Sequence, residues 1–399
     1  MVGRRPLEGI RVVELTVWLS GPIGGMLLAD LGAEVIKIES PAGDPTRSHR
    51  APTAGEAAGD RAVSVSYGVS NRNKKSIVLD LGSDEDRGVL EELVRSADVF
   101  LTNLTLRAIR KLGVDEEGIR AINPGIVFAH SGGFGHRGPL AEQPVQDMTG
   151  MAYSGMLFTM SSEANTPFAP PGATNDVMTG TMVAFGILAA LLDRQRTGEG
   201  QTVRSSLVMT SLWAQMQLVG SAANTAGAVV TGRPQTNPRS PVLNQYRCGD
   251  GKWIAIAVVT PRDWEPFLRA VGLTAQSLPD EVGGYADAVA HSGKMREFLD
   301  GFFAQRPRDE WLAMLRAEKL WCSPVNTIED VLRDDNIHEN HYLSTLDDGT
   351  VTVAMPFQLD GLAPPLRSGP QLGAHDAQIR DEVRAQRRRA SESSPAGPQ

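Results

Sequence analysis

The first third of the chain alternates short runs rich in β-branched residues with helical patterns. Strands that alternate with helices in this way pair in parallel through right-handed crossovers. The pattern therefore predicts an α/β fold built on an open parallel sheet. The five predicted strands are GIRVVELTV (9–17), EVIKIES (34–40), KSIVLDL (75–81), DVFLTNL (98–104) and GIVFAHSGG (125–133).

Long helices follow this alternating region. Met178 to Gln195 is apolar on most faces, with Asp176 as the predicted N-cap and Gly198 as the predicted C-cap. A second helix is predicted from about Ser205 to Ala222. The stretch GRPQTNPRSP (232–241) is rich in turn formers and predicts a linker, after which the composition changes.

The remainder predicts a second, smaller folding unit. QYRCGDGKWIAIAV (245–258) indicates a hairpin, and PRDWEPFLRAVG (261–272) and DEWLAMLRAEK (309–319) indicate amphipathic helices. Thr327 with Asp330 is typical of a helix cap. Strand-like runs such as VTVAMPFQL (351–359) then return, and the final residues are polar and predict a disordered tail.

Composition excludes several classes of function. The net charge of −8 argues against a general nucleic-acid or anionic-membrane surface. Two cysteines are too few for a disulfide framework, so a cytoplasmic location is expected, and the longest apolar run (182–192) is too short to span a bilayer. His338 and His341 have no carboxylate at a metal-binding offset, so we expect no metal site.

The segment G-P-I-G-G (21–25) follows the first predicted strand. Glycines there would let backbone amides approach an anion, and Glu39 could hold a ribose. The spacing is not G-x-G-x-x-G, however, so a tight turn is favoured over an NAD site.

A basic run, Asn71 to Lys75, precedes a strand that should be buried. Its three cations suit phosphate groups, because Arg and Lys form charge-assisted bonds to phosphate oxygens. A solvated turn before the strand explains the same residues equally well.

Asp147 stands alone among small and apolar residues in PVQDMTGMAYSG (144–155). A desolvated carboxylate is a good nucleophile, which suits covalent or acid/base chemistry. An Asp at such a place can equally be a helix N-cap or an ion-pair partner. The sequence contains no G-x-S-x-G motif, which argues against a serine hydrolase.

Taken in order, the motifs of this chain resemble the family III CoA-transferases, a group that also contains α-methylacyl-CoA racemase. The resemblance covers nearly everything from Pro6 to His375. Its motifs are PLEGIRVVELTVWLSGPIGGMLLADLGAEVIKIE, GDPTR, NRNKKSIVLDL, ADVFLTN, INPGIVFAHSGGFGHRGPL, PVQDMTGMAYSG, RTGEGQTVRSSL, WCSPVNT and LGAH.

The resemblance implies that Asp147 is the catalytic aspartate. It also implies no permanently bound cofactor, with CoA and acyl-CoA as substrates of the enzyme, together with a carboxylic acid acceptor. The implied CoA contacts are Trp18, Leu19, Ser20, Arg47, Asn73, Lys74, Lys75, Asn103 and Lys111.

The family's fold implies an interlocked homodimer, with a Rossmann-like large domain built from both chain ends and a smaller α+β domain between them. The expected divisions are a large domain from 1–225, a small domain at 226–330, a return segment at 331–380 and a disordered tail at 381–399.

Three positions depart from the family's pattern. Leu104 stands where an aromatic is common, Gln146 where an aromatic or His precedes the aspartate, and Met151 where Gln is usual. These changes indicate an altered acyl pocket.

Three other functions stay open. They are racemase-type proton transfer, for which His130 or His136 would be the second acid/base group, an NAD-dependent dehydrogenase, and a family member that binds CoA without turnover.

Overall fold

The computed structural model describes residues 5–48, 64–161, 166–225, 238–362, 364 and 366–393. The chain divides into two compact units, a large one from 1–156, 169–224 and 341–399 and a smaller one from 157–168 and 225–340. This division differs from the sequence prediction in two places. Residues 157–168 join the smaller unit, and the return to the large unit comes near residue 341, about ten residues later than expected.

The large unit is built on a six-stranded parallel sheet in the order β3-β2-β1-β4-β5-β6. All five predicted strands are confirmed in the structure. A sixth strand was missed, because TVRSS continues into a sequence with a helical pattern and the prediction began a helix at Ser205. The strands are β1 (Arg11–Leu15), β2 (Glu34–Glu39), β3 (Lys75–Val78), β4 (Val99–Thr102), β5 (Val127–Gly132) and β6 (Thr202–Ser206).

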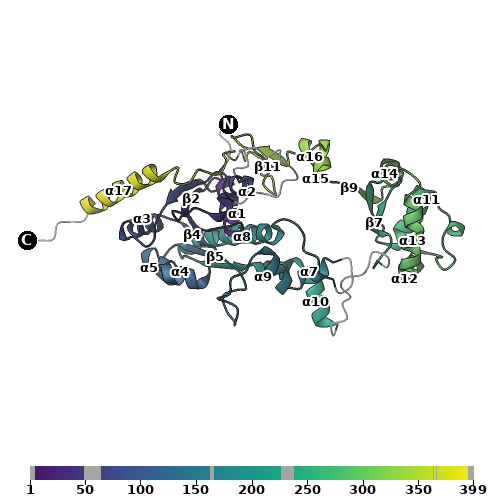
Figure 1. Cartoon of the computed structure of the whole chain (residues 1–399), viewed down its shortest axis with the longest axis horizontal. Coiled ribbons are helices and arrows are strands. Elements are labelled where there is room, and N and C mark those ends of the chain that lie inside the picture. The colour runs from purple at the N-terminus through teal and green to yellow at the C-terminus, as the bar shows by residue number, and fades with distance from the viewer. Residues whose placement is uncertain are drawn as a thin grey trace, which may run out of the picture. The chain divides into compact units, whose positions relative to one another are not determined.

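Successive side chains of these strands point to opposite faces of the sheet. Helices cover both faces, as is usual for a parallel sheet. Val12 packs with α1 (Ser20–Asp30) and α8 (Thr174–Thr197) on one face. Its neighbour Val13 packs on the other face with residues of α3, α4, α5 and α17 (Figure 1). The helices of this second face are α3 (Asp84–Arg95), α4 (Leu106–Leu112), α5 (Glu116–Ile122) and α17 (Asp376–Ser393).

Helix α1 contains the glycine-rich segment, so that segment is not the tight turn the sequence predicted. Its glycines permit close packing: a Cβ on Gly25 would lie 1.8 Å from Glu14 Oε2, and one on Gly180 of α8 would lie 2.5 Å from the Ser20 carbonyl oxygen. The turn between β1 and α1 is made by Trp18, which has a left-handed φ of 64°.

Helix α8 begins two residues earlier than its predicted N-cap. Ala173 is the N-cap, Asp176 is the third helical residue, and Gly198 ends the helix in the left-handed conformation as predicted. Within the described residues, α8 is the one helix with the length and hydropathy to cross a membrane. Here it packs along α1 and the sheet, as the core helix of a globular unit does.

The predicted second helix is divided at Gln215 into α9 (Leu207–Ala214) and α10 (Met216–Asn224). The shorter helices of the first part of the chain are η1 (Pro45–Arg47), α2 (Val65–Ser70), α6 (Asp147–Tyr153) and α7 (Met156–Thr159).

The smaller unit has an antiparallel sheet in the order β7-β8-β9, and the predicted hairpin is its first pair. Its own core includes Tyr246, Phe267, Phe303 and Trp311. The predicted linker (232–241) falls largely outside the described residues. The elements are β7 (Leu243–Arg247), β8 (Trp253–Ala257), β9 (Trp321–Val325), η2 (Pro261–Asp263), η3 (Ala275–Ser277), α11 (Trp264–Val271), α12 (Tyr285–Ala290), α13 (Ser292–Phe303), α14 (Arg308–Ala317), α15 (Ile328–Val331) and α16 (Asp335–Glu339).

The end of the chain returns to the large unit through the short hairpin β10 (Leu343–Thr345) and β11 (Val351–Val353). The predicted disorder from residue 381 is wrong as far as Ser393, because α17 runs to that residue. Ile379 and Val383 are buried in the core with residues of α3, which gives this helix an apolar anchor that the polar composition concealed. Figure 1 shows α17 following the sheet and α3. Residues 394–399 lie outside the described residues.

Candidate active site

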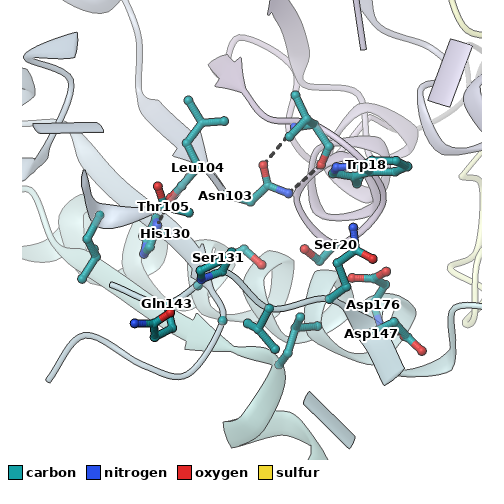
Figure 2. A pocket seen from close by; sticks show the side chains of 18 of the residues that line it. Trp18, Ser20, Asn103, Leu104, Thr105, His130, Ser131, Gln143, Asp147 and Asp176 are labelled. Carbon is teal, nitrogen blue, oxygen red and sulfur yellow. Dashed lines mark hydrogen bonds between the residues drawn. The ribbon is translucent and has the colours of Figure 1, made fainter. Parts of the chain in front are cut away.

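A cavity of about 190 Å³ opens at the carboxyl ends of β1, β4 and β5 (Figure 2). The chain leaves β1 toward β2 and β3 and later crosses back to β4, so the cavity lies where the winding direction of the sheet reverses. Open α/β sheets bind ligands at such a point. The cavity is lined by Val17, Trp18, Leu19, Ser20, Asn103, Leu104, Thr105, Leu106, His130, Ser131, Gly132, Gly133, Gly135, Ala141, Gln143, Pro144, Val145, Gln146, Asp147, Asp176 and Leu207.

Asp147 is the first residue of α6, and the Gln146 amide before it bonds Thr149 Oγ1 at 2.9 Å. Asp147 Oδ1 accepts a hydrogen bond from the Asp176 amide at 2.8 Å. Burial raises the pKa of Asp147, and hydrogen bonds from the backbone amides of Asp176 and Asn175 oppose that rise. The carboxylate is thus held by backbone amides at the wall of the cavity.

Asp176 is a second carboxylate of the cavity, which the sequence indicated only as a helix cap. Burial and the charge of Asp147 raise the pKa of Asp176 to about 7, and a hydrogen bond with Ser20 partly offsets them. Two acids with such different environments can hold different protonation states at neutral pH. Only packing could reveal this pair, because 28 residues separate its members in the chain.

His130 lies on the cavity wall, but both of its ring nitrogens are engaged. Nε2 is 2.8 Å from the Leu104 carbonyl oxygen, and Nδ1 is 2.6 Å from His136 Nε2. Because a carbonyl only accepts, His130 carries its proton on Nε2 and accepts from His136 at Nδ1. Burial lowers the pKa of His130, and burial with the neighbouring ring lowers the pKa of His136 to about 4. The pair is therefore neutral and structural.

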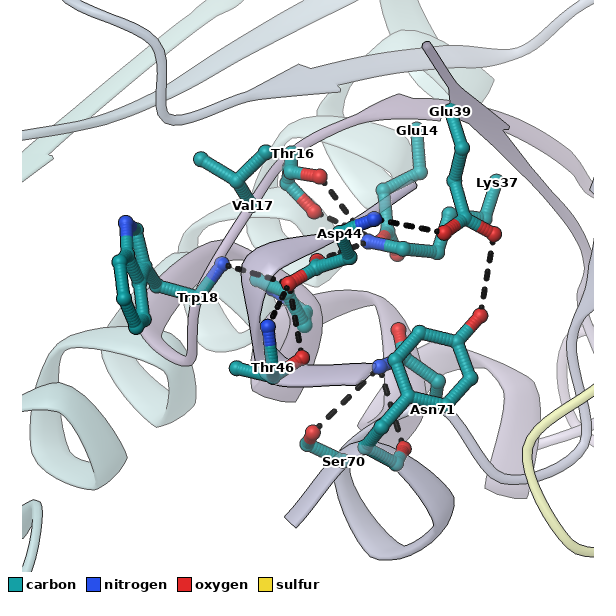
Figure 3. Close-up of polar contacts among 12 residues, drawn as sticks. Glu14, Thr16, Val17, Trp18, Lys37, Glu39, Asp44, Thr46, Ser70 and Asn71 are labelled. Atoms are coloured by element: carbon teal, nitrogen blue, oxygen red, sulfur yellow. Dashed lines mark hydrogen bonds and ion pairs between the residues drawn. The ribbon is translucent and has the colours of Figure 1, made fainter. Parts of the chain in front are cut away.

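The loop opposite Asp147 is held by side-chain bonds to its backbone. Asn103 accepts from the Val17 amide at 2.9 Å and donates to the Val17 carbonyl at 2.6 Å. Asp44 Oδ1 accepts from the Trp18 amide at 3.3 Å (Figure 3). These bonds hold Trp18, 41% exposed, in its left-handed conformation at the cavity.

A buried group of charges supports this loop from behind (Figure 3). Lys37 Nζ donates to the Thr16 carbonyl at 2.9 Å and pairs with Asp44 at 3.0 Å, and Lys74 Nζ pairs with Glu14 at 2.8 Å. All four charged side chains are fully buried. Breaking such a pair leaves an uncompensated buried charge, so the group fixes the loop as a unit.

The structure brings together Trp18, Leu19, Ser20, Asn103 and Asp147 of the predicted site. The other predicted CoA contacts do not line this cavity. Asn73 bonds Asp30, and Lys75 pairs with Glu34. Arg47 pairs with Glu39, Lys74 is buried, and Lys111 is exposed on α4.

The alternative interpretation of the basic run, a solvated turn, is wrong for Arg72 and Lys74, which are each 5% exposed. Both are neutralised by acids from earlier elements, Asp30 and Glu14. Of the departures from the family pattern, Leu104 and Gln146 line the cavity, whereas Met151 is buried in α6. Among the described residues, no group of three or more His, Cys, Asp or Glu side chains could hold a metal ion.

Comparison with known proteins identifies the family of this chain. Residues 7–376 match the family described as CoA-transferase family III. A succinate–glutarate CoA-transferase of Agrobacterium fabrum is 30% identical, covering 97% of this chain and 98% of the relative. Human α-methylacyl-CoA racemase is 28% identical, with 94% and 93% covered. The crystal structure of a CAIB/BAIF family protein from Brucella suis superposes with a TM-score of 0.83 at 29% identity, covering 95% of this chain and 99% of that one.

Proposed function

Because this chain belongs to CoA-transferase family III, we propose that it moves CoA from an acyl-CoA to a carboxylic acid through a covalent intermediate on Asp147. The observation that supports this most directly is the state of the Asp147 carboxylate. It lines the cavity at the start of α6, partly desolvated and oriented by the Asp176 amide at 2.8 Å.

The reaction needs a nucleophile and a way to keep water out. Asp147 attacks the donor thioester carbonyl, the C–S bond breaks, and a mixed anhydride forms with release of CoA thiolate. The thiolate attacks the aspartyl carbonyl and expels the donor acid, giving an aspartyl-CoA thioester. The acceptor carboxylate repeats these steps in reverse order. No proton has to be gained or lost, so positioning and exclusion of water carry most of the catalysis.

The cavity is too small for a whole CoA molecule, so the nucleotide end must lie elsewhere. A second cavity of about 340 Å³ at the ends of β2 and β3 shares Val17 and Leu104 with the first. It is lined by Gly43, beside Arg47, and by Leu112, beside Lys111. We place the nucleotide there, which would bring two of the predicted cationic contacts near its phosphates.

Racemase chemistry is the nearest rival, because it also acts on acyl-CoA within this family. It needs two acid/base groups that can exchange protons with the substrate. His130, one predicted candidate, has both nitrogens occupied, which argues against it in that role. An NAD site is disfavoured because the glycine-rich segment lacks the G-x-G-x-x-G spacing. The presence of Asp147 in the cavity argues against a family member that binds CoA without turnover.

Intact-mass analysis tests the proposal. The protein is incubated with a panel of acyl-CoAs and trapped with hydroxylamine or borohydride, beside the isosteric variant Asp147→Asn. We expect a CoA adduct on Asp147 of the native chain and none on the variant. Absence of any adduct, with deuterium exchange at the α-carbon of a 2-methylacyl-CoA, would move the assignment to the racemase.

We also propose that the chain works as a homodimer. Large apolar side chains are exposed on α8, α9 and α10, with exposed fractions of 67% for Phe185, 64% for Trp213 and 55% for Met216. Trp213 and Met216 line one apolar groove together with Met182 of α8. Exposed apolar surface of this kind is typical of a subunit interface. Analytical ultracentrifugation should show a dimer, and a monomer at micromolar concentration would contradict this proposal.

A further inference from the structure

We propose that a cavity at the amino ends of β2 and β3 binds a phosphate monoester, at a site separate from the active site. The cavity has a volume of about 560 Å³, and its lining includes Glu34 and Lys75, the first residues of these two strands. The active-site cavity opens at the opposite, carboxyl ends of the strands. This inference goes beyond the proposed CoA transfer and does not depend on it.

The position of the cavity keeps it apart from the surface proposed for dimerisation. Strand β3 is one edge of the sheet, whereas β6 is the other edge and leads into α9 and α10, which carry Trp213 and Met216. All residues that line the cavity belong to the large unit. The residues used in this argument therefore come from one compact part of the chain.

Two cations of the cavity have no acidic partner. Arg5 and Arg367 are exposed, and neither guanidinium forms an ion pair with a described residue. The Arg367 backbone is fixed by Asn73, whose amide donates to the Arg367 carbonyl and whose Oδ1 accepts from the Arg367 amide, both at 3.0 Å. Arg5 packs on Gly32, where an added Cβ would lie 2.7 Å from the Arg5 Cβ. Both side chains therefore extend from fixed points on the cavity wall.

Lys75 and His375 add two further donors. His375 Nδ1 accepts from the Ser76 amide at 3.2 Å, so the neutral ring carries its proton on Nε2. Burial and the charges of Lys75 and Arg367 lower the pKa of His375, as expected when these three side chains lie near one another. His375 is half-buried and lines the cavity, so a ligand can reach its ring.

The acids of the cavity are already bonded. Glu34 pairs with both Arg11 and Lys75, and Asp347 Oδ1 accepts from the Ser368 amide at 2.8 Å. Acids beside the cavity are bonded in the same way: Asp30 to Arg72, Asp348 to the Thr350 amide and Asp376 to the Val78 amide. The two unpaired guanidinium groups are therefore left for the anion of a ligand.

Charge and size indicate a phosphate monoester. Such a group carries nearly two negative charges at neutral pH, which matches the two unpaired guanidinium groups. Guanidinium and ammonium groups form charge-assisted bonds to phosphate oxygens. At about 560 Å³ the cavity has the size of a small-molecule site and exceeds what a bare phosphate ion needs. Ala33, Pro370 and Ala374 provide aliphatic walls for the organic part of the ester.

NMR of the His375 imidazole in the full-length protein tests this proposal, with the resonance assigned by comparison with His375→Gln. Titration with phenyl phosphate should shift the resonance saturably, with a Kd below about 1 mM. Arg367→Gln should weaken binding about tenfold, because it removes a charge-assisted bond. Arg333→Gln is the matched control, an exposed arginine of the smaller unit that does not line the cavity, and it should leave the Kd unchanged.

Benzoate, an aromatic monoanion, should bind at least about tenfold more weakly than phenyl phosphate. Equal affinity for the two would overturn the assignment to a phosphate monoester. The site itself would be overturned by the absence of a saturable shift up to about 10 mM phenyl phosphate, or by an equal Kd for Arg367→Gln and the native chain. None of these titrations uses an acyl-CoA, so their outcome is independent of the adduct expected on Asp147.

Discussion

Replacement of Asn103 by Ala should separate the stability of the loop from its role in catalysis. Asn103 makes two hydrogen bonds to the Val17 peptide, at 2.9 and 2.6 Å. Each neutral bond is worth about 1 kcal/mol, so the variant should lose about 2 kcal/mol. The same free energy lowers the equilibrium ratio of the native loop conformation to other conformations about 30-fold. We therefore expect kcat/KM to fall by up to about 30-fold.

Asn123 provides the matched control. Its side chain likewise makes two hydrogen bonds to the backbone and is partly buried. The side-chain amide donates to the carbonyls of Val94 at 3.0 Å and Ala97 at 2.9 Å. Urea unfolding should give about the same loss of unfolding free energy for Asn103→Ala and Asn123→Ala. Only the first should slow CoA transfer. Equal kcat/KM for the two variants would refute the view that the clamp on Val17 positions the active-site loop.

Three further perturbations follow from the geometry. Burial and the charge of Asp147 raise the pKa of Asp176 to about 7, so activity should fall above pH 7 as the ionised Asp176 repels the acceptor acid. Asp176→Asn should abolish this fall in the pH–rate profile. A fall that persists in the variant would contradict the role of Asp176. Burial raises the pKa of Glu39, but the bond from Arg47 and other partners lower it to about 2. That carboxylate therefore stabilises the fold above its unfolded pKa, and the stabilisation is lost as pH falls from about 4.5 to 2. Glu39→Gln should cost about 3 kcal/mol at pH 7 in urea unfolding and much less at pH 2, and an unchanged midpoint at pH 7 would be the opposing result. Gly180→Ala would place its Cβ 2.5 Å from a backbone oxygen of α1 and should cost about 1–3 kcal/mol, whereas Gly301→Ala meets nothing within 4 Å and should not destabilise.

The sheet could be predicted from the sequence because its strands carry the signal themselves. Runs such as RVVEL and EVIKIE are β-branched and buried on both faces, so local sequence and tertiary environment agree. Strand β6 could not be found in this way. Its residues TVRSS have intermediate or high exposure at three of five positions, and pairing with β5 at the sheet edge defines it.

The polar parts of the site were harder to predict, because they depend on partners distant in the chain. Lys74 and Arg72 are typical of a phosphate-binding turn until their acids are known, and those acids lie 60 and 42 residues away. Trp18, Ser20 and Asn103 were assigned through the family resemblance, and the structure brings them to one cavity with Asp147. Nothing in the local sequence marks Asp176 or Ser131 as part of a site, because Asp176 is typical of a helix cap and Ser131 of a strand end.

The segment that returns to the large unit covers an edge of the parallel sheet and so protects it from pairing with other molecules. Strand β3 is an edge strand, and its outward amides are the kind of unpaired donors that recruit strands from other molecules. Here the Ser76 amide donates to His375 Nδ1 at 3.2 Å, and the Val78 amide donates to Asp376 Oδ1 at 2.8 Å. During synthesis β3 therefore stays uncovered until His375 and Asp376, nearly three hundred residues later in the chain, have left the ribosome. Truncation before His375 should convert a protected edge into a site of aggregation.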